Sequence, residues 1–405
     1  MKRNKIDEMS KNVLKNYLIN SPSLLPFENR SFFEGHKTKR SILFQDRLKL
    51  PLKLFRDASV LDLGCGTGEQ DIMYGMWGSN CTLVDMNPIS TKKASSYFKS
   101  LGLQDNLDSV ETKSLFDFSS NKKFDFVFSE GVLHHTADPK KGFNIMVDHL
   151  ADNGFIMLQL AFDSSHFQRS LQRFILDYLT DGDINEIIKI SKRLFKETLE
   201  RANKYGGRSI DQIVFDFYTN PKHKGVAVSD CLSWFEDKGI QYYSSYPQIE
   251  PEGLIDGLHL PPSNVVMQKN SFLTSLADFF FMTASINDQD LIQKSQEDAI
   301  FSVEKKNQML GAANLKDYEY GSVIDLENFQ DAFVEYCDSI EKLKNNQSDS
   351  QLNTLKIFKK EVCALLIALK KRDLDQIEKI IHNFDVLFRG YNGVPSNYIV
   401  GYKKT

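Results

Sequence analysis

Three glycines at alternate positions, Gly64, Gly66 and Gly68, follow the short apolar run "SVLDL". A backbone without side chains can come close to a ligand, which is a frequent reason for such a cluster. The next apolar run ends in the acid Asp85, and a later one ends in "EGVLHH" (residues 130–135). A carboxylate can accept hydrogen bonds from hydroxyl groups, and histidine is the natural general base near neutral pH. These segments predict a ligand site with a candidate general base beside it.

The residues after the glycines restrict the ligand class. A P-loop requires Lys followed by Ser or Thr after its last glycine, but Gly68 is followed by Glu69. A dinucleotide site places a pyrophosphate at the start of a helix, where the carboxylate of Glu69 would repel it. We therefore expect a nucleoside-like ligand without phosphates. S-adenosylmethionine fits, since it joins an adenosine to a sulfonium and an amino-acid zwitterion, and Asp85 can accept hydrogen bonds from both ribose hydroxyls.

Alternating strands and helices would position these residues. Strands are predicted at 59–64, 81–87, 124–129 and 155–162, and residues 109–118 are predicted to form a further strand and a turn, with helices between the strands. This order predicts an α/β fold, a Rossmann-like doubly wound and mostly parallel sheet. Ligands of such sheets bind outside the carboxyl ends of the strands, and every unusual segment above lies at such an end.

Residues 60–162 resemble the core of class I S-adenosylmethionine-dependent methyltransferases of the small-molecule branch. "VLDLGCGTG" resembles their first motif, "LVDMNP" their second, "FDFVFSEGVLHHTADP" the block after strand four, and "LADNGFIMLQL" the turn into strand five. The resemblance implies a seven-stranded sheet with an antiparallel last strand. "VSDCLSWFEDKGIQYYSSYP" (residues 228–247) would supply the sixth strand and "GVPSNYIVGYKK" (residues 393–404) the seventh.

This assignment gives a domain organisation with large helical insertions. The predicted parts are an N-terminal helical substrate and cover segment (1–55), the S-adenosylmethionine-binding core (56–163), a helical lid (164–207), the core continuation with helix and strand six (208–250), a helical insertion (251–390) and the last core strand (391–405). Residues 164–207 have apolar residues at helical spacing and are predicted to form two helices ending at Gly206 and Gly207. A fixed cover is the alternative to a moving lid.

The family resemblance also implies roles for individual residues. Asp62 would orient the glycine loop or meet the amino group of the methionine part, Asp85 would bind the ribose, and Leu115 and Phe116 would flank the adenine. Glu130 and Gly131 would line the methionyl arm. The full set implied to bind the cofactor is Asp62, Gly64, Cys65, Gly66, Gly68, Asp85, Met86, Leu115, Phe116, Glu130 and Gly131.

Candidates for catalysis and acceptor binding are fewer. His134 and His135 lie beside the expected methyl donor and are candidate general bases, although either could instead cap the next helix or pack against strand five. His36 and Arg40 precede the first strand, where the family often places a substrate-facing helix. Tyr218 and His223 lie in a predicted loop, residues 216–225. Ordinary surface positions are the alternative for all four.

The sequence restricts the reaction and the partners. The predicted function is transfer of a methyl group by in-line displacement to a small or medium acceptor, which could be a metabolite, sugar, lipid or peptide. "SEGV" replaces the "NPPY" motif of amino-group methylation on adenine, and the net charge of −4 does not favour nucleic acid. The alternative is a methyltransferase-like, non-catalytic binding or assembly module that works through its helical insertion.

The composition indicates neither a metal site nor a membrane span. Five scattered cysteines without a CxxC pair argue against disulfides and a zinc site, so no metal is expected. The most apolar stretch, "FLTSLADFFFM" (residues 272–282), is about half the ~20 residues that a membrane span needs. We expect a cytoplasmic protein. Two apolar stripes between residues 355 and 388 predict a packed helix pair, and contact between two copies through this insertion stays open.

Overall fold

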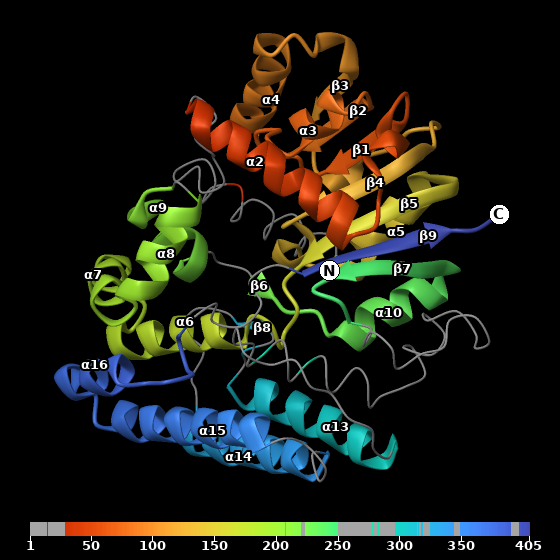
Figure 1. Ribbon diagram of the computed structural model, residues 1–405. Coiled ribbons are helices and arrows are strands. Elements are labelled where there is room, and N and C mark those ends of the chain that lie inside the picture. The colour runs from red at the N-terminus through yellow and green to blue at the C-terminus, as the bar shows by residue number, and fades with distance from the viewer. Residues whose placement is uncertain are drawn as a thin grey trace.

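The computed structural model describes Leu14 and residues 29–206, 208–219, 223–249, 278, 282, 296–313, 315, 317–318, 325–343, 349–389 and 397–405. Its centre is a seven-stranded sheet in the order β3-β2-β1-β4-β5-β9-β7 (Figure 1). The strands are β1 (Ser59–Leu63), β2 (Asn80–Asp85), β3 (Leu107–Thr112), β4 (Phe124–Glu130), β5 (Leu150–Leu160), β7 (Ile240–Tyr246) and β9 (Asn397–Lys403).

Strands β1 to β5 are parallel to one another, while β9 runs antiparallel to both neighbours, β5 and β7. The predicted Rossmann-like sheet with an antiparallel last strand is therefore confirmed. Because the strands are parallel, the ends of β1, β2 and β4 meet at one edge of the sheet, where the glycine loop, Asp85 and Glu130 follow them.

The helices of the α/β half begin where the sequence provides caps. Asn87 accepts hydrogen bonds from the backbone N–H groups of Ile89 and Ser90, and Pro88 takes the first helical position, where a missing N–H costs nothing. Asp138 caps the helix after β4 in the same way. The helices of this half are α2 (Arg30–Ile42), α3 (Asp71–Met76), α4 (Pro88–Ser100), α5 (Pro139–His149) and α10 (Val228–Asp237).

Aromatic side chains fix the N-terminal segment on one face of the sheet. Phe55 stacks on Phe126 of β4 with ring centroids 4.5 Å apart, and it stacks on Tyr74 of α3 at 5.7 Å. Phe44, which follows α2, packs edge-on against both Phe55 and Tyr74. All four rings are buried. This packing holds the end of α2 beside the strand edge that carries the predicted site.

The segment after β5 contains three helices, not the two predicted for residues 164–207. They are α6 (Phe167–Thr180), α7 (Ile184–Leu194) and α8 (Lys196–Gly206), and α9 (Ile210–Tyr218) follows. Asp181 and Gly182 both have positive φ and end α6, and Asp183 then caps α7. The predicted loop at 216–225 is corrected as well, because it begins inside α9 and contains strand β6 (His223–Lys224).

The helical insertion packs against α6. Its described helices are α13 (Gln296–Ala312), α14 (Leu326–Leu343), α15 (Asp349–Lys370) and α16 (Leu374–His382). Phe167 of α6 stacks on Phe333 of α14 with centroids 6.0 Å apart and contacts Phe358 of α15 at the same separation. The two predicted apolar stripes are buried in this core. Of the apolar stretch at 272–282, Asp278 and Met282 belong to the described residues and the rest lies outside them.

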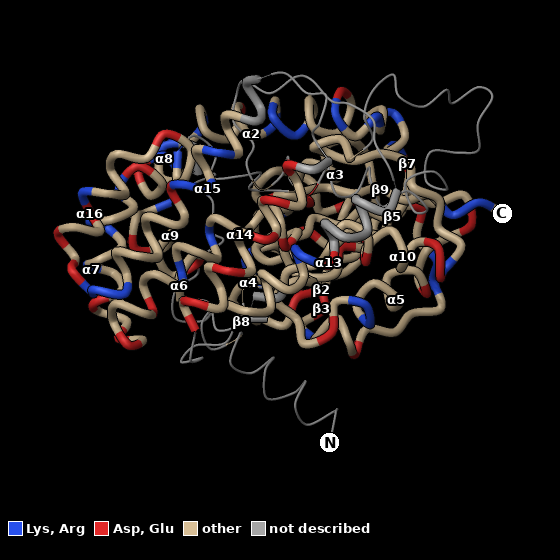
Figure 2. Tube along the Cα trace, turned by 90° about the horizontal axis from the view of Figure 1, so that it is seen from below, with Lys and Arg blue, Asp and Glu red and all other residues tan. Residues whose placement is uncertain are grey.

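Several of the described helices carry charged residues of both signs. Lys and Arg positions lie among Asp and Glu positions along α7, α8 and α16 (Figure 2). Within the part of the chain that the structure describes, we find no helix with the length and apolar character needed to cross a bilayer. The division into domains stays a prediction.

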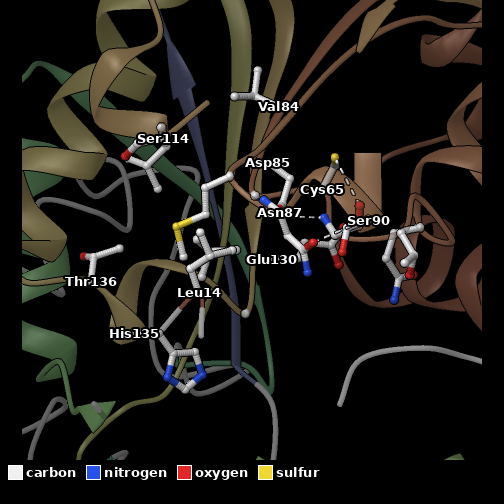
Figure 3. Close-up of a pocket in the computed structure, with 18 of the residues that line it drawn as sticks. Leu14, Cys65, Val84, Asp85, Asn87, Ser90, Ser114, Glu130, His135 and Thr136 are labelled. Atoms are coloured by element: carbon white, nitrogen blue, oxygen red, sulfur yellow. Dashed lines mark hydrogen bonds between the residues drawn. The ribbon is translucent and has the colours of Figure 1, made fainter. Parts of the chain in front are cut away.

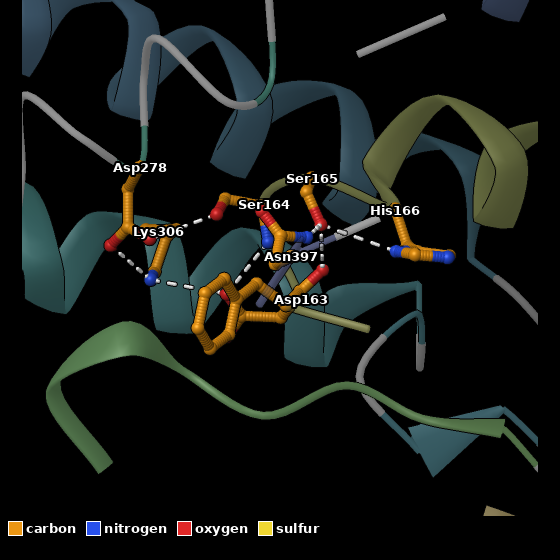
Figure 4. A network of polar contacts seen from close by, with 8 residues as sticks. Asp163, Ser164, Ser165, His166, Asp278, Lys306 and Asn397 are labelled. Carbon is orange, nitrogen blue, oxygen red and sulfur yellow. Dashed lines mark hydrogen bonds and ion pairs between the residues drawn. The ribbon is translucent and has the colours of Figure 1, made fainter. Parts of the chain in front are cut away.

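A buried polar network joins the helical insertion to the end of β5 (Figure 4). The ammonium group of Lys306 in α13 lies 2.5 Å from an oxygen of Asp278 and 3.3 Å from Asp163, and all three side chains are buried. Ser164 donates a hydrogen bond of 2.9 Å to Asp278. Asn397 at the start of β9 donates to Ser165 at 2.6 Å. The loop after β5 is thus held both by the insertion and by the last strand.

The first prediction concerns this network. Lys306→Met leaves two buried carboxylates without their counter-ion, so the free energy of unfolding should fall by about 3–5 kcal/mol. The neighbouring Lys305 pairs with the exposed Glu335, so Lys305→Met should cost at most about 1 kcal/mol. Urea denaturation of both variants measures the difference. Equal losses in the two variants would show that the network contributes no more than a surface ion pair.

Candidate functional site

A cavity of about 230 Å³ lies at the carboxyl edge of the sheet (Figure 3). It is bounded by the glycine loop after β1, the ends of β2 and β4, and the turn after β3. The residues predicted to bind the cofactor that line it are Gly64, Cys65, Gly66, Asp85, Met86, Leu115, Phe116, Glu130 and Gly131. Asp62 and Gly68 are not among the lining residues. The sequence motifs therefore converge on one cavity.

The three glycines of the loop have different surroundings. A Cβ on Gly64, where φ is +103°, would lie 2.3 Å from a methyl group of Val132, and one on Gly68 would lie 2.8 Å from Cβ of Ala94. Gly66 also has a positive φ, +55°, but a Cβ there would meet no atom within 4 Å. Gly64 and Gly68 are thus needed for packing of the protein itself, while Gly66 borders open space at the cavity.

Asp85 connects the glycine loop to the end of β2. Its carboxylate accepts hydrogen bonds from the backbone N–H of Gly66 at 3.0 Å and of Asn87 at 2.8 Å. Burial raises the pKa of Asp85, and these two bonds oppose that effect. Each carboxylate oxygen has more than one acceptor site, so the side chain can still accept bonds from a ligand in the cavity.

Glu69 also borders the cavity, at the start of the helix after the glycines. Its side chain is buried and accepts a hydrogen bond from the hydroxyl of Thr67. Helix α3 begins two residues later, at Asp71. A carboxylate therefore lies where a dinucleotide site would hold its pyrophosphate, as the sequence suggested. Sequence reasoning used Glu69 only to exclude phosphates and missed it as a lining residue.

Arg40 does not face the cavity as a free substrate-binding group. Its guanidinium donates two hydrogen bonds of 2.8 Å to the two carboxylate oxygens of Glu130, and Tyr74 donates a third to the same carboxylate. Arg40 is only 4% exposed. The pair ties α2 to the end of β4 and fixes Glu130 at the cavity wall. A partner 90 residues away in sequence leaves no local signal for this role.

His36 lies one turn before Arg40 on α2 and is partly buried. Burial, with the charge of Arg40 as a second cause, lowers the pKa of His36 to about 4, so its imidazole is neutral at pH 7. It is not among the residues that line the cavity.

The two predicted catalytic histidines are placed differently. His135 lines the cavity. His134 is buried behind it and accepts a hydrogen bond of 3.3 Å from the backbone N–H of Ala161 after β5. Burial, followed by the charges of His135 and His166, lowers the pKa of His134 well below its ordinary value. His134 therefore fits the alternative of packing against strand five. His135 is the histidine that borders the cavity.

Of the remaining substrate candidates, Tyr218 is not among the described residues that line the cavity. Tyr218 ends α9, is buried, and its hydroxyl donates to Oε1 of Gln172 at 3.1 Å. His223 is in β6, which lies beside the turn Leu133–His135. Polar lining residues that the sequence reasoning missed are Thr67, Gln70, Asn87, Ser90, Ser114, Thr136 and Gln159. Several of them follow strand ends, which is the signal that could have identified them.

Two acids lie under the glycine loop. Asp62 and Asp71 are buried, and each carboxyl acts on the pKa of the other. Burial raises the pKa of both carboxyls, and that of Asp71 reaches about 7. Asp62 is therefore a buried residue at the base of the glycine loop and does not line the cavity.

Residues 35–211 match the family described as "Methyltransferase domain". An uncharacterized protein from a Synechococcus species is 24% identical over 212 residues, which cover 48% of this chain and 50% of that protein. The chain thus spans about half the length of the curated relative that it matches.

Solved structures show the same kind of similarity at low identity. A S-adenosylmethionine-dependent methyltransferase from Clostridium acetobutylicum is 22% identical, with 27% of this chain and 46% of that chain covered and a TM-score of 0.25. The N-methyltransferase NodS from Bradyrhizobium japonicum is 19% identical, with 35% and 74% covered and a TM-score of 0.28.

The second prediction tests the acid pair. The pKa of Asp71 is about 7 in the folded protein and about 3.8 in the unfolded chain, so the stabilising proton is fully present below pH 4 and is lost as the pH rises to 7. Asn mimics the protonated carboxyl at every pH. Asp71→Asn should match the natural protein most closely below about pH 4 and exceed its free energy of unfolding by about 1–4 kcal/mol at pH 8.

Urea denaturation at a series of pH values measures this difference. Asp108→Asn, on the exposed β3, is the control and should shift stability by the same small amount across the range. A pH-independent effect of Asp71→Asn would mean that Asp71 is ionised throughout.

Proposed function

We propose that this cavity binds S-adenosylmethionine and that the chain transfers its methyl group to a small or medium acceptor, as the match of residues 35–211 to the family described as "Methyltransferase domain" supports. The observation that carries the proposal is the convergence of the glycine loop, Asp85 and His135 on one cavity at the carboxyl edge of the sheet.

The residues present fit this donor. The open space beside Gly66 admits a ligand against the backbone, and the carboxylate of Asp85 has acceptor sites left for ribose hydroxyls. Leu115 and Phe116 would flank the adenine, and Glu130 and Gly131 would border the methionyl arm. Acidic lining residues, Glu69 and Asp85 among them, favour a ligand with positive charge over a phosphorylated one.

The bound donor would supply an activated methyl group on its sulfonium. The chain's own residues would hold donor and acceptor in line and keep water away, which can provide much of such a rate enhancement. His135 is the candidate to take a proton from the acceptor, since it borders the cavity. His134 would act as a positioning residue, because it holds the turn against the strand end.

The acceptor class we propose is a metabolite, sugar, lipid or peptide, handled in the cytoplasm. A non-catalytic assembly role is less well supported, since the residues expected to hold the donor surround an open cavity. Binding of S-adenosylhomocysteine, the product form of the donor, tests the proposal directly. At ten times its dissociation constant, this ligand should add about 1.4 kcal/mol to the free energy of unfolding.

The third prediction concerns Asp85. Asp85→Asn removes a charged acceptor for the ribose hydroxyls, and hydrogen bonds to charged groups contribute about 1.5–3 kcal/mol each. The affinity for S-adenosylhomocysteine should fall at least about tenfold. Titration calorimetry on the folded variant measures it, with Asp108→Asn on the neighbouring strand as the control that keeps full affinity.

Gly66→Val is an independent check on the same site. The added side chain would enter open space that the ligand needs, so binding should be lost while the helical half stays folded. Unchanged affinity in both Asp85→Asn and Gly66→Val would rule out this cavity as the donor site.

The fourth prediction concerns the proposed lid, residues 164–207. Helix α6 is held by aromatic packing on α14 and α15, and Gln168 donates to the backbone of Met282 and accepts from that of Phe388. We therefore expect α6 to be a fixed cover, with ligand-dependent hydrogen exchange limited to α7–α8. Mass-spectrometric exchange with and without S-adenosylhomocysteine measures this. Faster exchange of α6 in the free protein would support movement of the whole segment.

A further inference from the structure

A group of imidazole and cationic side chains adjoins His135, which lines the cavity. The ring of His134 is 4.2 Å from that of His135 and 6.3 Å from that of His166, measured between centroids. His166 is the N-cap of α6, and Arg169 follows three residues later in the first turn of that helix. Side chains three apart in a helix are neighbours on its surface. Arg169 is thus one helical turn from His166, and its charge acts on both His166 and His134.

Arg169 differs from Arg208, which lies near the same aromatic ring. The guanidinium carbon of Arg169 lies 3.7 Å from the ring centroid of Phe217, and that of Arg208 lies 6.0 Å from the same centroid. Arg208 is paired with Asp216 at 2.8 Å. For Arg169, the structure records no hydrogen bond and no ion pair with any described residue. The N–H groups at the edge of the stacked guanidinium can therefore donate hydrogen bonds to another partner.

The surroundings favour a negatively charged partner. Arg169 is partly buried. Burial, which is the largest cause, lowers its pKa, and the charges of Arg208 and Arg173 act in the same direction, while Asp216 opposes them. A cation removed from water is stabilised by an anion that forms hydrogen bonds with it, and the planar guanidinium matches a carboxylate or a phosphate. The pKa values of His134 and His166 are lowered by burial, so these rings add no positive charge at pH 7.

We propose that Arg169 binds an anionic group of the methyl acceptor, a carboxylate or a phosphate, while the reacting atom of the acceptor lies beside His135 in the cavity. This inference rests on the proposed function and narrows it. Among metabolites, sugars, lipids and peptides, it selects acidic members and excludes neutral ones. Arg169 is then a specificity-determining residue and Phe217 supports its guanidinium from one face.

The test uses the reaction of phenylglyoxal with arginine in the natural protein saturated with S-adenosylhomocysteine. Peptide mapping by mass spectrometry follows Arg169 and Arg208 separately. Benzoate or inorganic phosphate at ten times its dissociation constant should slow modification of Arg169 about tenfold. Arg208, whose partner is Asp216, should be unaffected, and potassium chloride of equal ionic strength should protect neither. The anion that protects identifies the group as a carboxylate or a phosphate.

Calorimetry gives a second measurement that does not depend on the reactivity of Arg169. Arg169→Met should abolish the heat of binding of the protecting anion, and Arg208→Met should retain it. Both variants should bind S-adenosylhomocysteine with unchanged affinity. Equal anion binding by the natural protein and Arg169→Met, or protection by chloride alone, would overturn the inference while leaving the proposed function intact. Absence of S-adenosylhomocysteine binding in the natural protein would instead reject the proposed function.

Discussion

Acidic side chains gather at the carboxyl edge of the sheet, and the arrangement of the whole site depends on how their charge is balanced. Glu130 is neutralised by Arg40, which fixes α2 across the strand ends. Burial raises the pKa values of Asp62 and Asp71 beneath the glycine loop, which favours their neutral forms. Asp85 is held by two backbone N–H groups and still borders the cavity. A ligand that carries a sulfonium and an ammonium group complements such an edge, whereas a pyrophosphate would be repelled.

Local patterns in the sequence predicted the parts of this site that are local in the chain. The glycine loop, Asp85 and the turn after β4 each follow a strand end, so periodicity and turn residues were enough to place them together. The role of Arg40 could not be predicted in this way, because its partner Glu130 is distant in sequence and belongs to another element. The break after α6 was missed for a similar reason. Asp181 adopts a left-handed conformation that an aspartate takes only in a suitable context.

The loop after β5 determines how the helical half is attached. Asp163 and Ser164 contact the charge network of Lys306, Ser165 contacts Asn397 of β9, and His166 begins α6. A buried ion pair contributes little net stability to the fold. Its geometry must nevertheless be kept, because a buried charge without its partner is strongly destabilising. The network therefore fixes the direction in which α6 leaves the sheet. That direction in turn sets where His166 and Arg169 lie relative to the cavity.

The residues proposed to hold the donor and the residue proposed to hold the acceptor then carry opposite charges. The loop after β1 and the end of β2 contribute carboxylates, while the first turn of α6 contributes a guanidinium stacked on Phe217. A cationic donor and an anionic acceptor would each be disfavoured on the wrong side by like charge, and this discrimination requires no additional contact. His135 lines the cavity and lies next to His134, whose pKa is lowered by burial. A proton released by the acceptor would thus be taken up at the cavity wall, beside the imidazoles that adjoin α6.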